Sequence, residues 1–188
     1  MSGATVTSRA DIADLAPDET RSRIFLRRKG STNMTQAIDK DAAIGVLNRI
    51  LELELAGVVR YTHYALMVYG YNRIPIVGWL NAQADESLLH ARQAGELITS
   101  LGGHPSLGIG PLLETHQHDI GDILRESLAH EGEALKAYYE LLDHARDKDV
   151  RLEEYARTLI AEEQTHLDEV NKMLRVPGQT SSYVAGEI

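Results

Sequence analysis

Four stretches of this chain carry apolar residues at alternating steps of four and three, the spacing that lines up side chains along one face of an α-helix. The stretches lie at about residues 35–70, 76–101, 119–144 and 149–174. Breaks in the pattern fall at Gly70, Pro75 and the Gly102–Gly103 pair, residue types that end helices. The pattern therefore predicts four long helices, the first capped by Thr35 and the second beginning at residues 76–79.

The connection at residues 102–118 is rich in glycine and proline and shows no helical period. A connection this long is uncommon within a compact domain unless it has a particular task. We interpret it as a crossover that joins two parallel helices, which predicts an all-α four-helix bundle with a long crossover between helices 2 and 3. Its His104, His116 and His118 could bind a metal at the surface, but solvated loop histidines are the simpler interpretation.

The domain organisation follows from where the periodicity begins and ends. Residues 1–35 have none and are interpreted as an N-terminal extension, either a flexible tail or an arm that docks through Phe25 on another subunit. Residues 36–176 form the bundle domain. Residues 177–188 follow the helix-ending Pro177 and are expected to be a C-terminal tail.

Each predicted helix has a polar interruption near the middle of its apolar stripe. The first and third helices have a single glutamate there, and the second and fourth have a glutamate followed by a histidine. On any one helix this could be a solvated pair on the surface, but here every member falls in core register. Tyr61 lies two turns after the first of these glutamates, on the same stripe. The six interrupting residues are Glu54, Glu86, His90, Glu131, Glu163 and His166.

Four carboxylates buried together would repel one another, so most of them would have to hold protons. Two divalent cations would remove that penalty. A donor set of oxygens and two imidazoles, without thiolate, suits iron or manganese. One carboxylate from each of two helices, with a glutamate and a histidine from each of the other two, is the plan of ferritin-like di-metal bundles.

With these residues the chain resembles the bacterioferritin family from about Thr35 through Pro177. The matching stretches are LELELAGVVRY, HARQAGELITSLGGHPSL, LRESLAHEGEALKAYYELL and EEQTHLDEV. The resemblance implies a di-iron centre with two iron ions per chain, with Tyr61 close by. Its implied ligands are the terminal carboxylates Glu54 and Glu131, the bridging carboxylates Glu86 and Glu163, and the nitrogen donors His90 and His166.

The chain departs from that family in three ways. Its second helix has Glu-x-x-x-His where the family has Glu-x-x-His, so Ser87 stands three residues before His90. We expect Glu86 to reach the metals regardless, from a regular helix or through a π-bulge. Leu88 stands at the position of the family's haem-binding methionine, so we expect no haem. The chain also stops short of the family's small fifth helix, which leaves assembly into a large cage open.

Composition narrows the function further. The net charge of −9 argues against a nucleic-acid partner and favours cations. The sequence has no cysteine, which excludes thiolate metal sites, and no apolar run long enough to span a membrane or act as a secretory signal, so we expect a cytoplasmic protein.

The predicted function is a ferroxidase that oxidises Fe(II) with dioxygen or hydrogen peroxide, in iron storage or detoxification. We expect a homo-oligomer, a dimer or larger. A rubrerythrin-like peroxide-reducing protein is the alternative, weakened because the rubredoxin cysteines are missing from this sequence. Two further alternatives are not enzymes: a bundle that binds metal passively, and a structural bundle with a vestigial site.

Overall fold

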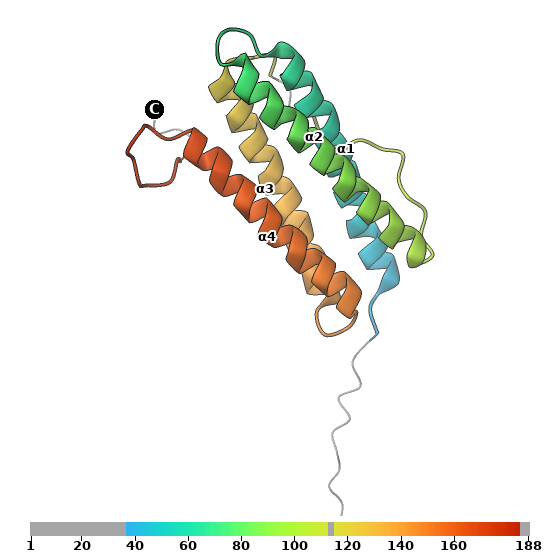
Figure 1. The fold of residues 1–188 in the computed structure, drawn as a ribbon. Helices are drawn as coiled ribbons and strands as arrows, with labels where there is room; N and C mark the ends of the chain where they lie inside the picture. Colours follow the sequence, from blue (N-terminus) through green and yellow to red (C-terminus); the bar gives the residue numbers. More distant parts are fainter. Residues whose placement is uncertain (1–36, 113–114, 185–188) are drawn as a thin grey trace, which may run out of the picture. The chain divides into compact units, whose positions relative to one another are not determined.

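The computed structural model describes residues 37–112 and 115–184, and within them it contains four α-helices and no strand. Helix α1 spans Lys40–Met67, α2 Arg73–Ser100, α3 Ile120–Ala145 and α4 Val150–Met173. Helix α1 packs against α2 and α3, and α3 packs against α4. Helices α2 and α3 run in the same direction, joined by a segment that returns along the bundle (Figure 1). The predicted four-helix bundle with one long crossover is confirmed.

Aspartate side chains begin three of the helices. Asp39, Asp119 and Asp149 each accept a hydrogen bond from a backbone N–H in the first turn of α1, α3 and α4. Such a carboxylate satisfies an otherwise unpaired donor and suits the positive end of the helix dipole. The prediction that Thr35 caps the first helix is wrong, because α1 begins at Lys40 with Asp39 as its cap. Thr35 itself lies outside the described residues.

Helix α2 begins earlier than the sequence predicted, at Arg73 rather than at residues 76–79. Pro75 therefore lies inside the first turn, where its missing N–H has no partner to lose. The Arg73 guanidinium donates to the carbonyls of Ala65 and Val68 near the end of α1. Pro75 thus belongs to the first turn of α2 and not to the connection that precedes the helix.

The crossover is hydrogen-bonded to α1. The N–H of Ser106 donates to Asn48 Oδ1 at 2.7 Å, and the N–H of Gly110 donates to the carbonyl oxygen of Glu52 at 2.8 Å. A Cβ atom at Gly110 would lie 3.0 Å from that carbonyl oxygen, so glycine allows the close approach. These contacts fix the path between the ends of two parallel helices.

The hydrophobic core is divided into two clusters along the bundle axis. The larger cluster includes Leu47, Ile98, Leu141 and Leu152, and the smaller one includes Tyr64, Leu80 and Ile123. On α1, α2 and α3 the polar residues that interrupted the predicted stripes fall between the two clusters in sequence, and on α4 they follow the residues of the larger cluster. These residues form a polar layer within the bundle.

The predicted extension, bundle domain 36–176 and tail remain a prediction, because residues 1–36 lie outside the described part of the chain. Residues 174–184, which follow α4, are not helical. Among the described residues, no helix is both long and apolar enough to cross a membrane.

Gly57 provides a test of the packing between α1 and α2. A Cβ atom there would lie 2.6 Å from Ser87 Oγ and 3.2 Å from His130 Nε2. We expect Gly57→Ala to lower the free energy of unfolding by about 1–3 kcal/mol, the usual cost of overpacking a core. Urea denaturation of the metal-free protein measures it. The control is Gly95→Ala on α2, where a Cβ meets nothing within 4 Å and better helix propensity should make the change neutral or stabilising. Equal effects would contradict the close contact.

Candidate metal centre

The polar layer is buried. Glu54, His90, Glu131 and Glu163 are between 2% and 6% exposed, one from each helix. The side chain of His166 is 16% exposed and that of Glu86 34%. A cavity of about 10 Å³, roughly enough for one water molecule, lies among seven side chains. These are Gln83, Glu86, Ser87, His90, Glu131, Glu163 and His166.

Glu163 lies between the two histidines and reaches one with each oxygen. Its Oε1 is 3.4 Å from His90 Nδ1, and its Oε2 is 3.6 Å from His166 Nδ1. Oε2 is buried and has no hydrogen-bond partner. A buried carboxylate oxygen without a partner is costly. The arrangement fits a carboxylate that bridges two cations, each also held by one imidazole Nδ1.

The other two buried glutamates each accept a hydrogen bond from a tyrosine on the opposite helix. Tyr138 on α3 donates to Glu54 Oε1 at 2.7 Å, and Tyr61 on α1 donates to Glu131 Oε1. Glu54 Oε1 also lies 3.7 Å from His90 Nδ1, and Glu54, His90 and Glu163 each offer a ligand atom within 4.8 Å of the other two. Each of these two glutamates is thus oriented by a tyrosine hydroxyl and keeps oxygen lone pairs that could bind a cation.

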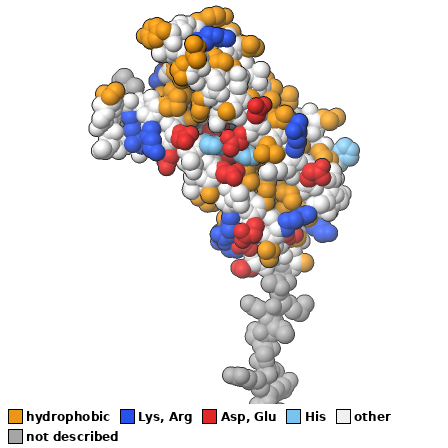
Figure 2. Space-filling model, in the orientation of Figure 1, with side chains coloured by type: hydrophobic (Ala, Val, Ile, Leu, Met, Phe, Trp, Pro, Cys, Tyr) orange, Lys and Arg blue, Asp and Glu red, His pale blue; other side chains and the backbone are white. Residues whose placement is uncertain are grey.

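The outward edges of the two histidines contact two further carboxylates. Glu86 Oε2 lies 3.3 Å from His166 Nε2, and Glu162 Oε2 lies 3.4 Å from His90 Nε2. Acidic side chains gather beside histidine on the face over α2 and α4 (Figure 2). A metal-binding histidine usually donates its other N–H to a carboxylate, which fixes the tautomer and the ring orientation. Glu86 and Glu162 are placed for that task.

The metal-free centre shares protons unevenly. Burial and then repulsion from Glu163 raise the pKa of Glu131 well above its ordinary value, and burial raises the pKa of Glu54. Burial also opposes ionisation of Glu163, but the neighbouring imidazoles of His166 and His90 lower its pKa to about 2. Burial disfavours a charged His90, yet the neighbouring carboxylates of Glu163 and Glu54 raise its pKa to about 10. Cations would therefore displace protons as they bind.

The structure brings all six predicted ligands into one layer, with Glu86 on the Nε2 side of His166 and not the Nδ1 side. Helix α2 is regularly α-helical through residues 85–90, without a π-bulge. The ligand roles themselves remain a proposal. The sequence analysis named neither Tyr138 nor Glu162 for the site. Tyr138 lies seven residues after Glu131, as Tyr61 lies seven after Glu54, and Glu162 lies four residues before His166, as Glu86 lies four before His90.

Two further histidines, His130 and His63, lie outside the predicted ligand set. His130 is buried next to Gly57, and burial followed by the charge of Arg60 lowers its pKa to about 4. His63 lies on α1 with its ring 5.5 Å from that of His118 in the crossover.

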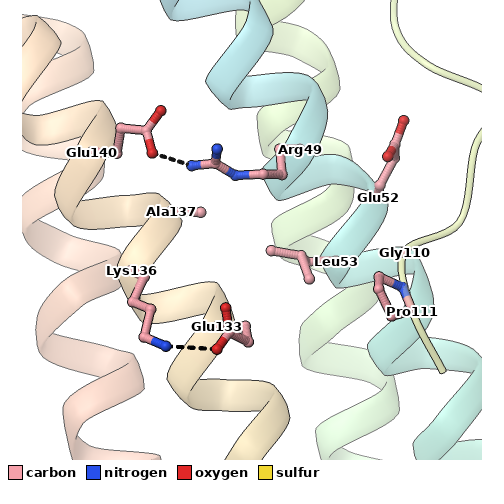
Figure 3. A pocket seen from close by; sticks show the side chains of 9 residues that line it. All are labelled: Arg49, Glu52, Leu53, Gly110, Pro111, Glu133, Lys136, Ala137 and Glu140. Carbon is pink, nitrogen blue, oxygen red and sulfur yellow. Dashed lines mark hydrogen bonds and ion pairs between the residues drawn. The ribbon is translucent and has the colours of Figure 1, made fainter. Parts of the chain in front are cut away.

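A separate pocket of about 430 Å³ lies between α1, α3 and the crossover (Figure 3). Ion pairs on its rim join Arg49 to Glu140 and Lys136 to Glu133. The pocket is also lined by Glu52, which accepts a hydrogen bond from the Ser106 hydroxyl. None of the six predicted ligands lines it, so this pocket is separate from the polar layer.

Comparison with protein families matches residues 44–177 to the ferritin-like domain of the ferritin family. Comparison with curated protein sequences found no match. The matched family segment includes the polar residues of all four helices.

Three solved structures share the fold at 25% sequence identity. A ferritin-like di-iron-carboxylate protein from Bacillus anthracis str. Ames has a TM-score of 0.69, covering 73% of this chain and 98% of its own. A dodecameric thioferritin, the bacterioferritin-related protein from Bacteroides fragilis, has a TM-score of 0.68 with coverage of 73% and 86%. Rhodobacter capsulatus bacterioferritin, solved with a metal-free dinuclear site and haem iron, has a TM-score of 0.66 with coverage of 70% and 82%.

The protonated His90 predicts how the stability of the metal-free protein depends on pH. Its pKa is about 10 when folded against an ordinary 6.5, so between these values the folded state binds more protons than the unfolded state. His90 therefore stabilises the fold fully below pH 6.5, and its contribution falls as pH rises towards 10, by at most about 1.4 kcal/mol per pH unit. Urea denaturation in chelator across this range measures the slope. His90→Gln should flatten it, and a wild-type stability that rises with pH would contradict the assignment.

Proposed function

The chain belongs to the ferritin-like domain family over residues 44–177, and from this we propose that it is a bacterioferritin-like ferroxidase that oxidises Fe(II) to Fe(III) in iron storage or detoxification. The observation that carries the proposal is Glu163, whose two oxygens face the Nδ1 atoms of two different histidines. Its Oε2 is buried without a hydrogen-bond partner, and a cation would supply one. The oxygen-rich donor set suits iron, and manganese fits the same set.

Fe(II) is the substrate, and the chain's residues supply charge and geometry for two ions. Glu54 and Glu131 would each hold one ion, Glu163 would bridge them, and His90 and His166 would each give one nitrogen. The sequence also predicts Glu86 as a ligand, and its position on the Nε2 side of His166 is considered in the next subsection.

The protonation of the centre changes when Fe(II) binds. His90, whose pKa is raised to about 10, holds a proton in the metal-free protein, and burial and Glu163 raise the pKa of Glu131. A proton on either group must leave before that group can bind a cation. Two Fe(II) ions give up two electrons, which with two protons convert dioxygen to hydrogen peroxide or convert hydrogen peroxide to two water molecules. Metal binding is thus coupled to proton release from the centre.

Substitution of Glu163 tests the proposal. We expect the wild-type protein to oxidise Fe(II), and Glu163→Gln to slow this by more than about 100-fold, beyond the 10–100-fold typical of residues outside the ligand set. Stopped-flow absorbance with dioxygen and with hydrogen peroxide measures the rate. Glu169→Gln makes the same chemical change at an exposed position on α4 and should leave the rate unchanged. Metal binding without oxidation in the wild type would favour the passive-binding alternative.

The same experiment separates the rubrerythrin-like alternative. Oxidation that is fast with peroxide and slow with dioxygen would favour a peroxide-reducing role. Such a protein would need an electron donor other than a rubredoxin centre in this sequence, which has no cysteine.

A homo-oligomer is the expected state. Apolar side chains are strongly exposed where α1 ends and α2 begins, at Leu66, Tyr69, Tyr71 and Ile74. Contiguous exposed apolar residues of this kind mark protein interfaces. The relative from Bacteroides fragilis is dodecameric. Light scattering should give a native mass of a dimer or larger, and a monomer at micromolar concentration would contradict this.

A further inference from the structure

The two halves of the bundle repeat the same polar layout. Glu54 on α1 is followed seven residues later by Tyr61, and Glu131 on α3 is followed seven residues later by Tyr138. Each tyrosine donates to the glutamate of the other helix. The layout therefore relates α1 to α3 by an approximate local two-fold symmetry about the centre.

Helices α2 and α4 follow the same relation. Trp79 precedes His90 by eleven residues, and Tyr155 precedes His166 by eleven. Trp79 makes an edge contact with Tyr61 at 6.2 Å between ring centroids, and Tyr155 makes one with Tyr138 at 6.0 Å. The equivalence thus extends to the aromatic side chains that support the centre.

Glu86 and Glu162 are also equivalent. Each precedes the histidine of its own helix by four residues, and each contacts Nε2 of the histidine on the other helix, at 3.3 and 3.4 Å. A carboxylate of Glu86, one of Glu162 and a nitrogen of His90 lie within 4.8 Å of one another. Because Glu163 contacts the Nδ1 edges, these two carboxylates lie on the opposite edges of the rings.

The relation fails at one position. Glu163 precedes His166 by three residues, and the residue three before His90 is Ser87. Ser87 is buried and lines the cavity, on the other helix from Glu163. Its Oγ would lie 2.6 Å from a Cβ atom at Gly57. On the α2 side of the centre, the small Ser87 side chain therefore packs directly against the backbone of Gly57.

We propose that this centre has one bridging carboxylate and not two. Ser87 is the counterpart of Glu163 and leaves the opposite bridging position to water, while Glu86 and Glu162 are equivalent positioning residues that hold His166 and His90 through Nε2. The inference rests on the proposed function. The carboxylates on the Nδ1 side are then Glu54, Glu131 and Glu163. Their three negative charges are one fewer than are needed to neutralise two divalent ions.

The Nε2 contact distinguishes this arrangement from a bridging Glu86. To bridge, Glu86 would have to leave His166 Nε2 and reach the side of the ring where Glu163 lies. The regular α-helix at residues 85–90 supplies no bulge to turn it there. Glu86 stays at the more exposed edge of the layer, with Gln83 Nε2 donating to its Oε2 at 3.5 Å.

Matched glutamine variants test the assignment through metal binding. If Glu86 is a positioning residue, Glu86→Gln and Glu162→Gln should behave alike, each keeping two Co(II) ions per chain with affinity lowered by about 10–100-fold. Glu163→Gln should lose the second ion. Asp85→Asn, an exposed neighbour on α2, should match the wild type. Competition with a chelator gives the affinity, and the Co(II) absorption spectrum reports a changed histidine environment. Loss of an ion in Glu86→Gln but not in Glu162→Gln would overturn the proposal.

A gain-of-function pair tests the role of Ser87. Ser87→Glu would restore the missing charge, and we expect it to bind Co(II) at least about tenfold more tightly than the wild type, because affinity follows the charge of the ligand set. Ser87→Gln has nearly the same size without the charge and should not. Circular dichroism checks that both variants fold. A folded Ser87→Glu with unchanged or weaker affinity would contradict an open position, and if it does not fold, the comparison of Glu86 with Glu162 decides.

The outcomes keep this inference apart from the proposed function. A wild-type protein that binds no divalent ions would refute both. A wild type that binds two Co(II) ions and oxidises Fe(II), together with a Glu86→Gln variant that behaves like Glu163→Gln, would refute only the single bridge.

Discussion

The structure depends on the burial of carboxylates in the middle of a hydrophobic bundle. Glu54, Glu131 and Glu163 are buried in the core of the bundle, where ionised groups are costly and mutual repulsion adds to the cost. In the metal-free state tyrosine hydroxyls and a protonated histidine relieve part of that cost. The buried Oε2 of Glu163 is left without a hydrogen-bond partner, and a cation would supply one. At this polar layer, the core therefore has carboxylates and histidines in place of apolar side chains.

The bundle meets this constraint by using the same layout twice. Two helices each supply a glutamate and a tyrosine, and two each supply a histidine with carboxylates on the preceding turn. The crossover makes the arrangement possible, because it lets α2 and α3 run in the same direction (Figure 1). Ser87 and Glu163 occupy equivalent positions but differ in chemistry, whereas the residues around them follow the repeated layout.

Small residues decide how closely the helices approach at the centre. Gly57 gives Ser87 and His130 room beside α1, and Gly110 lets the crossover lie against the backbone of the same helix. Family membership and solved structures at 25% identity support the fold.

The sequence by itself determined the four helices, the crossover and the layer of polar residues, because helical periodicity records which side chains face the core. Charge repulsion among the predicted carboxylates also pointed to metal from sequence alone. Only the tertiary structure decided which edge of each histidine meets which carboxylate. A residue three before a histidine and one four before it both share its helix face, so spacing could not separate the Nδ1 side from the Nε2 side. Glu162 and Tyr138 likewise became partners of the centre only through contacts between helices, which no single-helix pattern contains.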